Sequence, residues 1–60
     1  MNEQREIRDY LVRQFTLQVG RRDSLRQDRP ELSRDEFSRE LERLNNVVEF
    51  LQSEFQRLEN

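Results

Sequence analysis

A chain of 60 residues with a formal net charge of −2 has room for one small domain and one thin apolar layer between helices. It contains no cysteine and no histidine, which excludes disulfides and thiolate metal sites and removes the commonest general base near neutral pH. Its single glycine excludes a glycine-rich phosphate loop, so we expect neither a cofactor nor a bound metal.

Targeting signals are also missing from the sequence. No run of about 20 apolar residues is present to span a membrane. The first six residues lack the apolar core of a signal peptide. We therefore expect a cytoplasmic protein that makes no contact with a membrane.

The first predicted helix begins near Glu3. Its apolar residues recur in steps of four: Ile7, Leu11, Phe15 and Val19. Gly20 follows, and a glycine in that place is the usual signal for the end of a helix. Ending there would leave a long unstructured link in so short a domain. We therefore expect the helix to span about residues 3–27, with a break at Gly20 as the alternative.

A turn and a second long helix follow. Pro30 disfavours helical geometry at Arg29 and cannot donate a hydrogen bond from its own nitrogen, which predicts a turn over about residues 28–32. Ser33 and Glu36 have the spacing of a capping box. This pattern predicts that the second helix spans about residues 34–59.

Seven apolar residues of the second helix alternate in steps of four and three. They are Phe37, Leu41, Leu44, Val48, Leu51, Phe55 and Leu58. Such a heptad seam packs against other helices, and small helical chains commonly gain missing burial by association. We expect an all-α fold with one domain over residues 1–60: a two-helix antiparallel hairpin that dimerises into a four-helix bundle through this self-association seam.

The flank of the seam carries two further apolar residues, Val47 and Phe50. Phe50 is too large to leave exposed without a reason, and packing inside a four-helix bundle would provide one. The alternative is a docking surface on which Phe50 anchors a protein partner. The candidate partner-binding residues are Val47, Phe50, Leu51, Phe55 and Leu58.

Four arginines cluster around the predicted turn: Arg21, Arg22, Arg26 and Arg29. Arginine suits contacts with phosphate, so these residues are candidates for binding nucleic acid. The chain as a whole is acidic, however, and two aspartates lie among the arginines. A solvated turn is therefore the favoured interpretation, and a contact with an acidic protein surface is a further alternative.

The carboxylates are spread along the helices at ion-pair spacing, and no acid–base pair with a surrounding pocket is indicated. The sequence therefore predicts a protein that is not an enzyme. We expect a non-catalytic protein-binding module, such as an adaptor, assembly factor or inhibitor, that acts through amphipathic helix faces. The alternatives are a small RNA- or DNA-binding regulator using the arginine cluster and a purely structural oligomerisation module.

Overall fold

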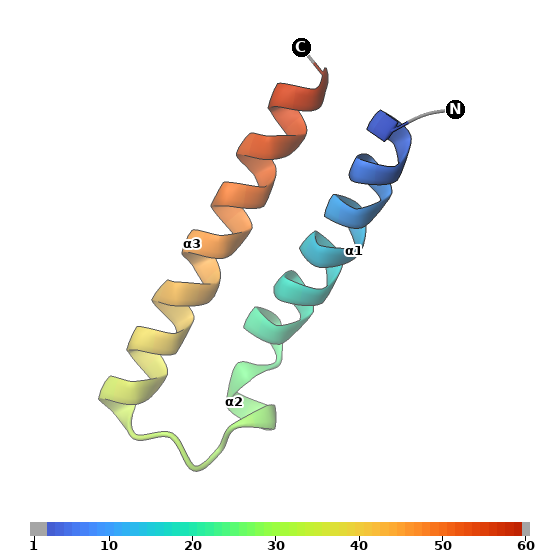
Figure 1. The fold of residues 1–60 in the computed structure, drawn as a ribbon. Coiled ribbons are helices and arrows are strands. Elements are labelled where there is room, and N and C mark those ends of the chain that lie inside the picture. Colours follow the sequence, from blue (N-terminus) through green and yellow to red (C-terminus); the bar gives the residue numbers. More distant parts are fainter. Residues whose placement is uncertain (1–2, 60) are drawn as a thin grey trace.

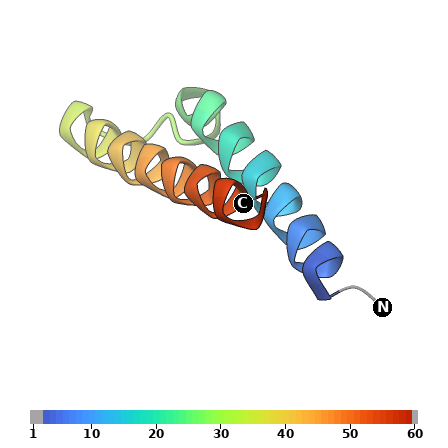
Figure 2. The same cartoon turned by 90° about the horizontal axis from the view of Figure 1, so that it is seen from above.

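The computed structural model describes residues 3–59. Three helices form most of this part: α1 (Glu3–Asp23), α2 (Leu25–Asp28) and α3 (Arg34–Glu59). α1 and α3 run antiparallel, side by side, with α2 near the turn (Figure 1). Seen from above, the two long axes are inclined to each other (Figure 2). Residues 3–59 contain no strand, so the protein is an all-α helical hairpin. We call the end with α2 the turn end and the opposite end the open end.

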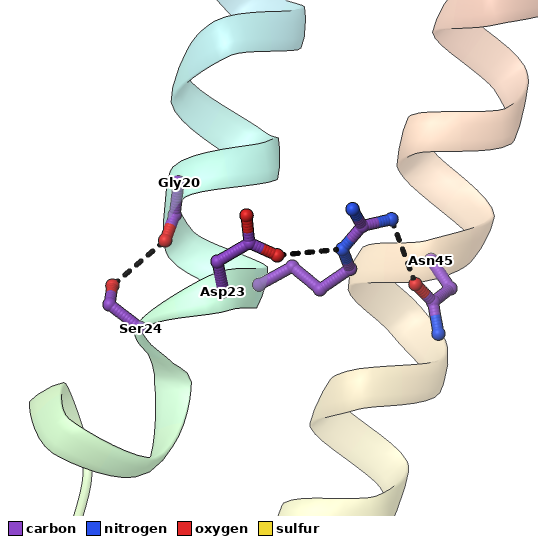
Figure 3. Close-up of polar contacts among 5 residues, drawn as sticks. Gly20, Asp23, Ser24 and Asn45 are labelled. Atoms are coloured by element: carbon purple, nitrogen blue, oxygen red, sulfur yellow. Dashed lines mark hydrogen bonds and ion pairs between the residues drawn. The ribbon is translucent and has the colours of Figure 1, made fainter.

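The first helix passes through Gly20 and is interrupted at Ser24 instead. The Ser24 backbone N–H donates to the Gly20 carbonyl at 3.0 Å. Its Oγ lies 2.8 Å from that carbonyl oxygen (Figure 3) and 2.7 Å from Oδ2 of Asp28. The hydroxyl has a single proton, so the two short distances represent two competing acceptors for it. Serine side chains that bond the carbonyl four residues earlier often bend helices, which accounts for a break at this position.

The start of α3 has the reciprocal hydrogen bonds of a capping box, as the sequence predicts. The Ser33 N–H donates to Oε1 of Glu36 at 2.8 Å, and the Glu36 N–H donates to Ser33 Oγ at 3.2 Å. Two of the helix's otherwise unpaired N–H groups are thereby satisfied. The Arg26 guanidinium also lies over the Phe37 ring, 4.0 Å from its centroid, and so ties α2 to the first turn of α3.

The core lies between the two long helices and toward the turn end. Its buried side chains are Leu25, Leu44, Val48 and Leu51. Nearer the open end, Phe15 and Phe55 meet edge to face, with ring centroids 5.9 Å apart. The seam predicted for self-association is therefore occupied within the chain: three of its residues are buried inside the hairpin, and Phe37, Leu41, Phe55 and Leu58 are half-buried.

The packing side of α1 differs from the steps of four read in the sequence. Ile7 is 50% exposed, whereas the other three residues of the predicted row, Leu11, Phe15 and Val19, are half-buried, as are Gln14, Gln18 and Arg22. Among these six half-buried residues, Leu11, Phe15, Gln18 and Arg22 advance in steps of four, three and four. A row in steps of four drifts around a helix, while alternating steps keep facing a neighbour, so α3 contacts the alternating row.

Candidate protein-interaction surface

Several large apolar side chains of the hairpin are exposed to solvent. Five have exposed fractions between 46% and 61%: Ile7, Tyr10, Val12, Leu17 and Phe50. Phe50 is the most exposed of them, at 61%. Single exposed apolar residues are ordinary on protein surfaces, but rows of them indicate an interaction surface.

Three of these side chains form a row along α1. The row advances in alternating steps of four and three: Glu3, Ile7, Tyr10, Gln14, Leu17 and Arg21. Its last four members each come one position before a residue of the row that packs on α3. At roughly 100° per residue, these rows occupy adjoining sides of the helix. α1 therefore has one side that contacts α3 and a second side on which Ile7, Tyr10 and Leu17 are exposed among polar residues.

A matching row follows α3 beside its buried seam. Its members also alternate in steps of four and three: Arg43, Val47, Phe50, Glu54 and Arg57. Val47 and Glu54 are half-buried, and Phe50 stands exposed between them. The Arg57 guanidinium donates to Oε2 of Glu54 at 3.1 Å, an exposed pair of small energetic value.

Both rows lie on the same side of the hairpin. Near the turn end, one groove between the long helices is lined by Arg21 from the α1 row and Arg43 from the α3 row, together with Leu25 and Leu44. Because each row follows its own helix, the residues farther along also border this side. We call the surface made by the two rows the outer face.

An ion pair lies at one corner of the outer face. Arg43 donates to both carboxylate oxygens of Glu40, at 2.6 and 3.2 Å. The hydrogen bond from Arg43 lowers the pKa of the Glu40 carboxyl, and the same bond raises the pKa of Arg43. Glu40 is thus kept ionised beside the groove, and the positive charge of Arg43 is partly neutralised.

The predicted partner-binding residues divide into two groups. Val47 and Phe50 lie on the outer face. Leu51 is buried in the hairpin, Phe55 packs against Phe15, and Leu58 is half-buried near the open end. The three residues of the second group therefore contribute mainly to holding the hairpin together.

Sequence reasoning missed the contribution of α1 to this surface. The steps of four put Ile7 in one row with Leu11 and Phe15, and they do not place Tyr10 and Leu17 on an interaction surface. A signal was present, because these three residues fit an alternating row displaced from the row through Leu11 and Phe15. Two overlapping apolar rows on one helix indicate two neighbours.

The arginine cluster does not form one free basic patch. Arg22 contacts Asp23 Oδ1 at 3.4 Å through Nε and the Asn45 side-chain oxygen at 3.3 Å through Nη1 (Figure 3). Arg26 lies over Phe37. Arg29 pairs with Glu31, and this hydrogen bond raises the pKa of Arg29. Arg21 borders the outer face. Three of the four arginines thus have partners within the chain.

Two further features are absent from the part of the chain that the structure describes. Residues 3–59 contain no group of three carboxylates placed to hold a metal ion. Neither long helix, over the same residues, has an apolar stretch that would cross a bilayer. Comparisons with known protein families, with characterised proteins and with solved structures find no match to this chain.

Proposed function

We propose that the protein is a small non-catalytic protein-binding module, such as an adaptor, assembly factor or inhibitor, and that it binds through the outer face. The observation that supports this most directly is the 61% exposure of Phe50, in a row with Val47. Fully burying a phenylalanine side chain is worth about 1.5–3 kcal/mol, so a partner that covers Phe50 gains substantially. Aromatic residues of this kind are typical anchors of interfaces.

The spacing of the two rows indicates the shape of the partner. Alternating steps of three and four are the pattern with which one helix packs along another. A partner that supplies two helices would complete a four-helix bundle with α1 and α3. A homodimer is the simplest assembly of that kind, and we propose that it forms in the cytoplasm.

Substitution of Phe50 tests the proposed surface. In binding assays with the full chain, Phe50→Ala should weaken capture of a protein partner at least tenfold, with little dependence on salt. Val12→Ala is the control, because Val12 is exposed but belongs to neither row of the outer face. Circular dichroism should show equal helix content in both variants.

Binding of nucleic acid would give the opposite pattern. It should weaken steeply with added salt and depend on Arg21, while Phe50→Ala should leave it unchanged. That result would overturn the proposed function. The engagement of three of the four arginines within the chain argues against it. A purely structural oligomerisation module would bind only copies of itself.

A further inference from the structure

We infer that the outer face is covered by a second copy of this chain, related by a two-fold axis along the length of the hairpin, so that Leu17 of each copy contacts Phe50 of the other. The inference rests on the proposed function, because it names the partner of the same surface. It also fixes an orientation: the two turn ends lie together. α1 of one copy then runs antiparallel to α3 of the other, beside the outer face of both.

The need for such a partner follows from how little the hairpin buries. Only four apolar side chains are buried among residues 3–59, while five large ones stay about half exposed or more. Isolated helices depend on packing of their apolar sides, and a single thin layer gives a chain of this size little stability. A second copy of the chain is the simplest partner, because it is present wherever the protein is made.

The size of the face fits a stable dimer. The hairpin measures 47 × 17 × 12 Å along its principal axes, so a broad face covers 47 × 17 Å. A partner would have to cover most of this side to bury the roughly 800 Å² that each partner contributes to an interface of standard size. The broad side that contains the outer face is therefore large enough, and a peptide or one short helix would leave much of it uncovered.

The register of the two rows selects the orientation. Within the hairpin, Phe15 lies against Phe55 and Arg22 bonds Asn45, so these contacts mark two levels along its length. Leu17 and Phe50 both fall between these levels. Rotation about the long axis preserves levels, which brings Leu17 of one copy opposite Phe50 of its partner.

The remaining members of the rows fit the same register. Gln14 and Glu54 adjoin the Phe15–Phe55 level, and Tyr10 and Arg57 lie just beyond it toward the open end. The rotation therefore sets the Gln14 amide near a Glu54 carboxylate and the Arg57 guanidinium near the Tyr10 ring. An amide with a carboxylate and an arginine with an aromatic ring are both favourable pairs. Reversing one copy end to end would move these groups away from each other.

The first test measures association of the unmodified full chain. Light scattering on a sizing column across a dilution series should show a dimer that dissociates on dilution. Phe50→Ala and Leu17→Ala should each weaken dimerisation at least tenfold, and Val12→Ala should change it less than threefold. A monomer at every concentration would overturn the inference. The proposed function would survive that result if the monomer still bound another protein through Phe50.

Disulfide trapping tests the orientation, and the absence of native cysteine makes it clean. Leu17→Cys and Phe50→Cys variants are mixed in equal amounts and oxidised under mild conditions. The concentrations are kept well above the dissociation constants that light scattering gives for the two alanine variants, so that dimers form although both substitutions weaken the contact. The disulfide between the two different variants should form in excess over both disulfides between like variants. A mixture of Val12→Cys with Phe50→Cys measures the background from random collision. Predominance of the Phe50→Cys disulfide with itself would mean that the copies are reversed, which would overturn the inferred orientation.

Discussion

Ser33 and Glu36 show how two residues determine where a helix begins. Each donates its backbone N–H to the side chain of the other, at 2.8 and 3.2 Å. The hydrogen bond from the Ser33 backbone N–H lowers the pKa of Glu36 below its ordinary value of 4.5, and a hydrogen bond with the Ser33 side chain lowers this pKa further. The ionised form of Glu36 is therefore favoured in the folded chain.

This lowered pKa predicts acid sensitivity. The stabilisation is fully present above the ordinary pKa of 4.5 and is lost as the pH falls through the lower pKa of the folded state. The free energy of unfolding, measured with urea, should therefore fall between pH 7 and pH 3. Glu36→Gln keeps a side chain suited to the capping box but cannot ionise there, so it should lose less stability over this range.

Other carboxyls will retain part of the acid sensitivity in that variant. Hydrogen bonds from Arg29 and Arg43 lower the pKa values of Glu31 and Glu40, respectively. We therefore expect Glu36→Gln to reduce the acid loss without abolishing it. Equal losses in the variant and the unmodified chain would mean that the capping box does not persist in solution.

Gly20 lies inside α1 without any local reason to be glycine. Its φ is not positive, and an added Cβ would meet no atom within 4 Å. Gly20→Ala should stabilise the chain by about 1 kcal/mol, because alanine is the better helix former. For a domain of this size, that raises the melting temperature by roughly 4–8 °C.

Gly20→Pro is the matched control at the same position, and it should destabilise the helix that Gly20→Ala stabilises. Proline in a helix interior costs about 3 kcal/mol or more, so this variant should lose helix content at 25 °C. Circular dichroism during heating would record both effects. If both variants melted like the unmodified chain, α1 would not continue through residue 20 in solution.

At the scale of whole elements, α3 could be read almost completely from the sequence. Its capping box, its heptad seam and its extent all appear in the structure, because an uninterrupted pattern of this length leaves few alternatives. α1 was less predictable. Its apolar residues are spread over two rows, and only contact with α3 decides which row is covered.

The break between α1 and α2 shows a second limit of prediction from the sequence. Gly20 had the stronger signal for a helix end, but the helix continues through it and is interrupted at Ser24. The deciding interaction is a serine hydroxyl near the Gly20 carbonyl and the Asp28 carboxylate, which composition does not indicate. Only the α3 part of the candidate site was predicted from the sequence. Phe50 was identified from its position on α3, but its neighbours on α1 depended on how the two helices pack.

Leu44 is the most deeply buried side chain of the core, with an exposed fraction of 1%. Truncating a buried leucine to alanine costs about 2–5 kcal/mol, which is a large part of the stability of so small a domain. Leu44→Ala should therefore leave the chain largely unfolded at 25 °C, as measured by circular dichroism and urea titration.

Val12→Ala is the control for Leu44→Ala, because Val12 is 46% exposed and belongs to no buried layer. This substitution should cost no more than about 0.5 kcal/mol. If the two variants lost similar amounts of stability, the α1–α3 layer would not be the main support of the fold.

At the scale of the whole molecule, charge argues against nucleic acid as a partner. The formal net charge is −2, and three of the four clustered arginines are engaged within the chain. Proteins that bind DNA without sequence preference typically do so with dissociation constants of about 10⁻⁴–10⁻⁶ M at physiological salt. We expect weaker binding than this range for duplex DNA.

Fluorescence anisotropy with a labelled duplex, repeated at several salt concentrations, would measure that binding. Arg21→Ala is the informative variant, because the other three clustered arginines contact partners within the chain. Tight binding that falls steeply with salt and is lost in Arg21→Ala would contradict the expectation.

The uneven placement of the core has a consequence for how the hairpin opens. Leu25, Leu44 and the Arg22–Asn45 contact lie near the turn, whereas α1 itself contains no fully buried residue. Local opening needs the least free energy where few apolar contacts are broken. Backbone amides of residues 7–12 should therefore exchange with deuterium at least tenfold faster than those of residues 44–51. We therefore expect the hairpin to fray from its open end, so that a protease would cut there before it cuts near the turn.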